Sequence, residues 1–134
     1  MDADLTFYWI NENGVIQLKD LEGDREIEIQ KQGWLSGEWK AFSNHRSEIL
    51  AQKSSSFSKT VQFFSHGESY QLEKINLFSR SMTLTGPDCE IEIRPNHIFT
   101  RSCMITGMAK DMNLVLFATW MTLLLWRRSS RRNN

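Results

Sequence analysis

The chain has little cysteine and no net charge, and its first residues lack the pattern of a secretory signal. Its 134 residues include two cysteines, Cys89 and Cys103. Two cysteines are too few for a disulfide scaffold, which predicts free, buried thiols in a reducing cytosol. The first residues, 1–5, are acidic, and no apolar run follows a basic segment there. We therefore expect no secretory signal and a cytoplasmic protein.

Motifs that carry common chemistries are also missing. The sequence contains no Gly-x-x-x-x-Gly-Lys, Gly-x-Gly-x-x-Gly or Gly-x-Ser-x-Gly, so neither a phosphate-binding loop nor a nucleophile elbow is indicated. His45, His66 and His97 do not have the spacing of metal ligands, and neither do the cysteines. The acidic segment 20–26 lacks the spacing of a calcium loop. We therefore expect no catalytic site, no metal and no cofactor.

Opposite charges are balanced in number but not in position. Lys and Arg number 16, as do Asp and Glu, which gives a formal net charge of zero. The residues after Trp126 include four Arg and no acid, so this end carries +4 and the rest of the chain −4. A body of negative charge opposes association with nucleic acid, which we do not expect as a partner.

Turn residues divide most of the chain into short strands. Asn13-Gly14 is typical of a hairpin, and Gly86-Pro87-Asp88 of a tight turn. Segments 26–30 and 89–94 alternate apolar and charged residues, and no helical period of useful length occurs before Gly107. About ten strands in close succession predict an antiparallel meander. The expected strands cover residues 5–10, 15–21, 26–30, 39–42, 47–53, 57–64, 69–75, 80–85, 89–94 and 97–106.

One long apolar segment follows, from Met112 to Trp126, and we predict that it is a helix. Its polar residues are Asn113, Thr119 and Thr122. At about 100° per residue these three do not share one face. A helix that is apolar all round must be buried, either in a protein core or in a bilayer.

Burial inside the sheet fits the length of this segment. At about 1.5 Å per residue it spans roughly 22 Å, which matches strands of about six or seven residues and is shorter than the roughly 30 Å core of a bilayer. A barrel of about ten strands also has an interior that must be filled. We therefore predict a mostly β fold, an antiparallel meander of about ten strands that forms a barrel-like sheet around a C-terminal apolar helix.

The predicted domain boundaries follow from this fold. Residues 1–128 form a single β domain that includes a C-terminal helix at 108–127, and residues 129–134 form a basic, disordered tail. Two alternatives stay open. In one, the helix is a single-pass membrane anchor, although its terminal Arg residues would then have to cross the bilayer, against the usual bias of basic residues. In the other, a small β-barrel carries an apolar ligand and the helix lies outside it.

Several of these features together resemble the tubby C-terminal-like superfamily, in the branch of phospholipid scramblases and LURP-one-related proteins. They are the short strands, the repeated Glu-Ile-x-Ile strand starts at Glu26 and Glu90, the tryptophans Trp34 and Trp39, and the terminal apolar helix. The resemblance covers residues 5–126 and implies strands wrapped around a central hydrophobic helix. It also implies a cytosolic, non-enzymatic domain, with lipid head groups or DNA as ligands in relatives. The usual member has twelve strands, and neither its ligand residues nor the calcium-binding segment of scramblases matches a position here.

The sequence thus predicts a non-enzymatic binding or scaffold domain. Its candidate ligand is an anionic lipid surface, contacted by the basic residues beside Trp126 with roughly 1 kcal/mol per charge. The other interpretation of these residues is a charged cap that keeps the helix soluble. No protein partner is indicated, and we expect a monomer that is cytoplasmic or peripheral at a membrane. The candidate binding residues are Arg127, Arg128, Arg131 and Arg132.

Overall fold

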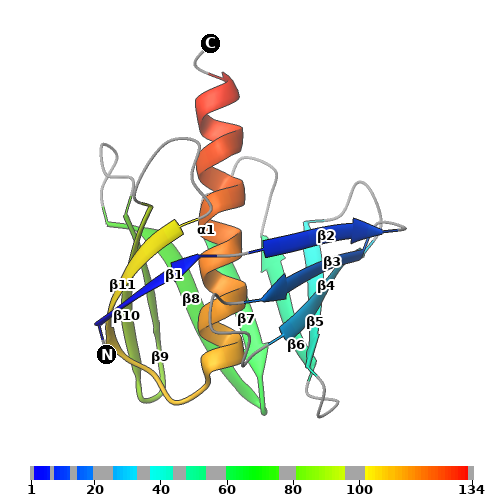
Figure 1. The fold of residues 1–134 in the computed structure, drawn as a ribbon. Coiled ribbons are helices and arrows are strands. Elements are labelled where there is room, and N and C mark those ends of the chain that lie inside the picture. Colours follow the sequence, from blue (N-terminus) through cyan, green and yellow to red (C-terminus); the bar gives the residue numbers. More distant parts are fainter. Residues whose placement is uncertain are drawn as a thin grey trace.

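The computed structural model describes residues 2–6, 8–12, 15–19, 26–32, 37–43, 48–53, 60–75, 81–95 and 102–132. Within these ranges the chain forms eleven strands followed by one helix (Figure 1). The elements are β1 (Asp2–Thr6), β2 (Tyr8–Glu12), β3 (Val15–Lys19), β4 (Glu26–Gln32), β5 (Glu38–Ser43), β6 (Glu48–Lys53), β7 (Val61–Ser65), β8 (Glu68–Lys74), β9 (Met82–Gly86), β10 (Cys89–Pro95), β11 (Ser102–Met108) and α1 (Met112–Arg132).

All eleven strands belong to one antiparallel sheet, in the order β1-β11-β10-β9-β8-β7-β6-β5-β4-β3-β2. From β2 to β11 each strand pairs with the next in the chain, so the predicted mostly β meander with a C-terminal helix is confirmed. The sheet has eleven strands in the described ranges where about ten were expected. No ladder joins β1 to β2 in that part of the chain, so the sheet is open and a closed barrel is not formed there.

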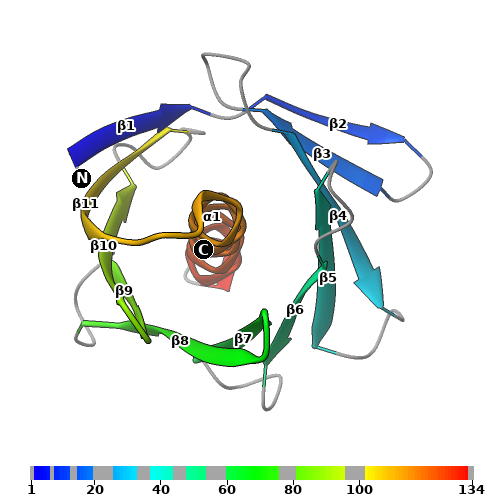
Figure 2. The same ribbon diagram turned by 90° about the horizontal axis from the view of Figure 1, so that it is seen from below.

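A single stretch of chain supplies both edges of the sheet. The expected strand at residues 5–10 is divided, because β1 ends at Thr6 and β2 begins at Tyr8. β1 pairs with β11 and β2 pairs with β3, and both run in the same direction because the eleven neighbours alternate. Since Thr6 and Tyr8 are two residues apart, their Cα atoms lie within roughly 7 Å of each other. The sheet must therefore curl until the end of β1 lies near the start of β2, and Figure 2 shows its strands arranged around α1.

Period-two alternation determines which strand residues face the helix. Ile27 and Ile29 in β4 are buried, as are Ile91 and Ile93 in β10, while Glu90 and Glu92, which alternate with the isoleucines of β10, are exposed. Successive side chains of a strand point to opposite faces, so a regular apolar-polar pattern gives one buried and one solvated face. Among the residues whose side chains the structure describes, the core contains the inner faces of β4 to β11 and the buried side chains of α1.

The helix fills the space inside the curved sheet. Every side chain from Leu114 to Leu123 is buried, so α1 is covered on all sides over this length, as the missing polar face predicted. Phe117 packs edge-on against Phe63 of β7, with ring centroids 5.2 Å apart and an interplanar angle of 83°. Such T-shaped pairs add roughly 0.5–1.5 kcal/mol beyond the area they bury.

The two buried threonines of α1 are satisfied within the helix. The Thr119 hydroxyl donates to the Val115 carbonyl at 2.7 Å, and the Thr122 hydroxyl donates to the Ala118 carbonyl at 2.8 Å. Both threonines are fully buried, so without these bonds each hydroxyl would cost free energy. Because these hydroxyls bond to carbonyls of the same helix, α1 can be buried although Thr119 and Thr122 are polar.

The bounds of α1 differ from the predicted range 108–127. The helix begins at Met112 and continues to Arg132, so residues 129–132, assigned to a disordered tail, are helical. Residues 133 and 134 lie outside the described residues. The later start has a physical cause, because Asp111 caps the helix. The helix also ends later than predicted, at Arg132. Its last residues include four arginines, and Arg is a good helix former whose positive charge is favourable near a helix C-terminus.

The last strand was expected to end at residue 106, so that Gly107 would separate it from the helix, but the strand continues past this glycine. Gly107 lies inside β11, opposite Ile91 of β10, and the strand continues to Met108. Its φ of 123° lies in a region that L side chains rarely adopt, and a Cβ atom at this position would overlap the carbonyl oxygen of Glu90. The glycine is therefore required by the close approach of two strands.

Among the described residues, no helix is both long and apolar enough to cross a membrane.

Candidate functional site

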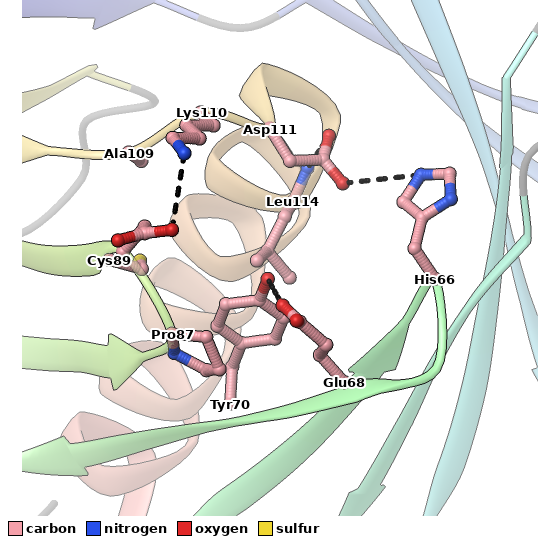
Figure 3. A pocket seen from close by; sticks show the side chains of 10 residues that line it. His66, Glu68, Tyr70, Pro87, Cys89, Ala109, Lys110, Asp111 and Leu114 are labelled. Carbon is pink, nitrogen blue, oxygen red and sulfur yellow. Dashed lines mark hydrogen bonds and ion pairs between the residues drawn. The ribbon is translucent and has the colours of Figure 1, made fainter.

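The three residues before α1, Ala109 to Asp111, lie beside two hairpin turns at one end of the sheet (Figure 3). One turn, His66-Gly67, joins β7 to β8, and the other, Pro87-Asp88, joins β9 to β10. The chain passes beside both turns as it enters the interior of the sheet. This arrangement brings together polar side chains that are far apart in the sequence.

Both turns have backbone conformations that fit their residues. His66 and Gly67 have φ values of 52° and 77°, which is the pattern of a type I′ turn and suits a two-residue hairpin. In the second turn Pro87 is followed by Asp88 with φ 52°, which is typical of a type II turn. The sequence predicted both hairpins, since the strands expected around residues 66–68 and 86–88 are paired in the structure.

Asp111 connects the start of the helix to the first hairpin. Its Oδ1 atom accepts hydrogen bonds from the backbone N–H groups of Asn113 at 3.1 Å and Leu114 at 3.2 Å, which is N-cap geometry. Its Oδ2 atom accepts from the buried Ser65 hydroxyl at 3.1 Å and lies 3.9 Å from His66 Nε2. One carboxylate therefore both caps α1 and anchors it to the end of β7.

Lys110 makes the matching contact with the second hairpin. Its Nζ atom lies 3.1 Å from Asp88 Oδ2, and both side chains are exposed. An exposed pair of this kind contributes little free energy, typically below about 1 kcal/mol. The ion pair instead helps to fix the position of the segment before α1, which lies between the two hairpin turns.

These residues line a pocket of about 390 Å³, within the size range of small-molecule sites. Its walls also include Glu68 and Tyr70, whose hydroxyl donates to Glu68 Oε2 at 3.2 Å. Burial, and then this hydrogen bond, raise the pKa of Tyr70 above its ordinary value. The carboxylates of Glu68, Asp88 and Asp111 outnumber the single amine of Lys110, so the pocket is acidic. Its polar groups are paired with one another and serve mainly to fix the start of α1.

Ser65, His66 and Asp111 are the residue types of a hydrolytic triad, but their order is different. In such a triad the nucleophile bonds to the histidine, which in turn bonds to the carboxylate. Here the Ser65 hydroxyl bonds directly to Asp111, and Ser65 faces the interior with 3% of its surface exposed. The arrangement therefore provides a structural contact and no activated nucleophile.

The two cysteines lie in the core and are free thiols, as predicted. Burial raises the pKa of Cys89 to about 11, with a smaller contribution from the charge of Asp111. Burial also raises the pKa of Cys103, to about 12. Because the thiolate is the reactive form, both thiols are unreactive at neutral pH.

The predicted lipid-binding residues belong to the opposite end of α1. The backbone at Arg127, Arg128, Arg131 and Arg132 is helical, and Figure 1 shows the last turns of α1 extending beyond the strands. Their side chains lie outside the described residues. At about 100° per residue, these four positions fall within an arc of roughly 140° on the helix. Trp126, directly before these positions, is buried.

The residues that were considered as metal ligands, and for which no metal site is expected, lie only partly within the described ranges. His45, His97 and segment 20–25 lie outside the described residues. Within the described ranges, no group of three or more His, Cys, Asp or Glu side chains could hold a metal ion.

Reasoning from sequence did not find the cluster around Asp111. Ser65 and Asp111 are 46 residues apart, and no spacing rule relates them. The available signal was the aspartate directly before an apolar helical segment, which is a typical N-cap position. That signal predicts the start of the helix, but the contact with Ser65 depends on how the sheet curves.

Comparison with known proteins gives no match, since no family model, curated protein or solved structure is detectably similar to this chain.

Proposed function

We propose that the protein is a non-enzymatic binding or scaffold domain that contacts anionic membrane surfaces through the C-terminal end of α1. We refer to Arg127, Arg128, Arg131 and Arg132 as the arginine end. The observation that carries the proposal is that α1 continues as a helix to Arg132 and that its last turns extend beyond the strands. A cationic helix end that projects from a folded body can reach a flat surface.

Because α1 occupies the interior of the sheet, binding is more easily explained by the outer surface of the molecule than by an internal cavity. The space within the sheet is filled by α1, with side chains from Leu114 to Leu123 buried. A carrier of an apolar ligand needs an open cavity in this place. The interior helix therefore favours a binding or scaffold domain over the carrier.

Charge supports an anionic surface as the ligand. The arginine end carries +4, and the pocket at the other end of α1 contains Glu68, Asp88 and Asp111 against Lys110. The molecule is thus basic at one end of its helix and acidic at the other, which would orient it on a negative surface. Basic residues near such a surface contribute roughly 1 kcal/mol each, and salt weakens this attraction.

The same architecture supports kinship with tubby-like domains. A curved antiparallel sheet with an apolar C-terminal helix at its centre is the arrangement that this resemblance implies. We propose that the 2–12 stretch, which provides both sheet edges, closes the sheet into a barrel in the manner of those domains. On this proposal the protein is a cytoplasmic monomer, peripheral at a membrane.

Sedimentation with vesicles tests the proposal. The full chain is mixed with vesicles of neutral lipid, with and without anionic lipid, at low and high salt. We expect binding that requires anionic lipid, is lost at high salt, and weakens about tenfold or more when Arg131 and Arg132 are both changed to Gln. A matched control changes Lys31 and Arg94, two exposed basic residues of the sheet, to Gln.

The outcomes separate the remaining interpretations. Equal, near-zero sedimentation with both kinds of vesicle would leave the arginine end as a solubility cap and contradict the proposal. Binding that resists high salt and requires detergent for release would indicate the membrane-anchored alternative. An equal effect of the Lys31 and Arg94 changes would show that overall charge, and not the arginine end, determines binding.

A further inference from the structure

We propose that Ser130 is a phosphorylation site for an arginine-directed protein kinase and that its phosphate releases the arginine end from anionic surfaces. The proposal rests on the proposed membrane contact and names its regulation. It starts from the segment Arg127-Arg128-Ser129-Ser130-Arg131-Arg132, in which two hydroxyl groups lie inside the strongest cationic run of the chain.

The spacing of the arginines selects Ser130. Arg127 and Arg128 precede it by three and two residues. Kinases that read this spacing use carboxylates in their substrate groove, and guanidinium groups pair with carboxylates through two parallel hydrogen bonds. Ser129 has arginines one and two residues before it, so it lacks the more distant contact.

The fold leaves this part of the helix accessible to an enzyme. Trp126 of α1 is buried, and Ser130 follows about one helical turn later in the same helix. Figure 1 shows the last turns of α1 beyond the strands. A kinase needs its substrate in an extended form, and the terminal turn of a helix opens at low free-energy cost because few contacts hold it. Phosphorylation there does not require opening of the core.

The chemical step is an ordinary phosphoryl transfer. The Ser130 Oγ atom attacks the terminal phosphorus of a nucleoside triphosphate held by the kinase, and a new O–P bond forms. The bond from that phosphorus to the bridging oxygen breaks, and the nucleoside diphosphate leaves with the electron pair. The hydroxyl proton passes to a carboxylate base of the kinase. The products are phosphoserine and the diphosphate.

The added charge explains release. A phosphoserine carries about −1.5 to −2 at neutral pH, which lowers the charge of the segment from +4 to roughly +2. It also lies near a helix C-terminus, where negative charge is unfavourable, and one turn from Arg127, with which it can pair. Losing about two effective charges at roughly 1 kcal/mol each corresponds to a roughly 10- to 30-fold weaker binding to anionic vesicles.

The experiment treats the full chain with an arginine-directed serine kinase and ATP. Mass spectrometry maps the modified residue, and sedimentation with anionic vesicles compares the phosphorylated and unmodified forms. We expect one phosphate on Ser130 and a roughly 10- to 30-fold loss of binding. Ser130→Ala should remove the modification and bind like the unmodified chain. Ser129→Ala is the matched control, which should still be modified and released.

Each result distinguishes this inference from the proposed function. Modification at Ser129 alone, or none at all, overturns the assignment of Ser130. Full modification of Ser130 with unchanged vesicle binding overturns the release mechanism while the membrane contact stands. An unmodified chain that does not bind anionic vesicles overturns the membrane contact and with it the release, whereas the mapped phosphate still decides whether Ser130 is the acceptor.

Discussion

Gly107 occupies a backbone position that other residues adopt only at a cost. Its φ is 123°, and a Cβ atom would meet the Glu90 carbonyl. We expect Gly107→Ala to lower the free energy of unfolding by more than about 1 kcal/mol, because strain and steric overlap add. Gly67→Ala is the matched control, since Gly67 also has positive φ but nothing lies within 4 Å of its added Cβ. Equal losses for both variants in urea titrations would contradict the overlap with Glu90.

The Asp111 side chain caps α1 and accepts a hydrogen bond from Ser65. Two substitutions test whether these hydrogen bonds or the negative charge matter more for stability. Asp111→Ala removes the helix cap and leaves the buried Ser65 hydroxyl without its acceptor. We expect a loss of about 1–3 kcal/mol in the free energy of unfolding. Asp111→Asn keeps the capping oxygen, and its amide can donate to Ser65 instead. It should therefore lose less than half as much, and an equal loss for both variants would show that charge is decisive.

Cys103 makes stability depend on pH on the alkaline side. Burial raises its pKa from 9.0 to about 12, so the thiol stays protonated in the fold while the unfolded chain ionises. The stability due to this group is complete below about pH 9 and is lost as the pH rises toward 12. We expect the fall in unfolding free energy between pH 7 and 11 to be smaller in Cys103→Ala than in the natural chain. An identical fall in both would refute the buried-thiol contribution.

At the scale of elements, the burial of α1 predicts different costs for similar side chains. Leu116 and Leu123 are fully covered, whereas Leu125 is only half-buried. Leu116→Ala and Leu123→Ala should each cost about 2–5 kcal/mol, and Leu125→Ala clearly less. Denaturant titration measures all three. A uniform cost along the helix would mean that the sheet does not enclose it as described.

The elements themselves were largely predictable, for reasons of local chemistry. Alternation identified the inner faces of β4 and β10, and Asn-Gly and Gly-Pro-Asp signals placed the hairpins. The continuous apolar run identified a buried helix. The division of the expected strand 5–10 into β1 and β2, and the place of Gly107 inside β11, were not predictable, because each depends on how separate strands approach one another. The Ser65–Asp111 contact at the start of α1 is non-local in the same way.

At the scale of the molecule, charge is arranged along the helix. Acidic groups surround the start of α1, and the arginine end lies at its other terminus. The helix macrodipole is positive at its start and negative at its end, so both groups of charges complement it. The same arrangement that stabilises the helix leaves one end of the molecule strongly basic. This is the end for which we propose a surface contact.

The whole fold depends on α1, because in the part of the chain that the structure describes this helix is the element that covers the inner face of the sheet. The strands from β4 to β11 direct buried side chains such as Phe63, Leu72, Leu84 and Ile105 toward the space that the helix occupies. A chain ending at Asp111 would expose these side chains to water, at roughly 1.5–3 kcal/mol for each large one, which exceeds the usual stability of a domain this size. We expect it to aggregate or to lack a cooperative thermal transition.

A chain ending at Trp126 is the control for this truncation. It keeps the buried part of the helix and removes only the arginine end, so it should melt cooperatively within a few degrees of the full chain. Calorimetry and sedimentation measure both chains. If the chain ending at Asp111 were monomeric and melted like the full chain, the sheet would be stable without its central helix. The helix would then be an attachment to the domain, and its burial by the strands would contribute nothing to the fold.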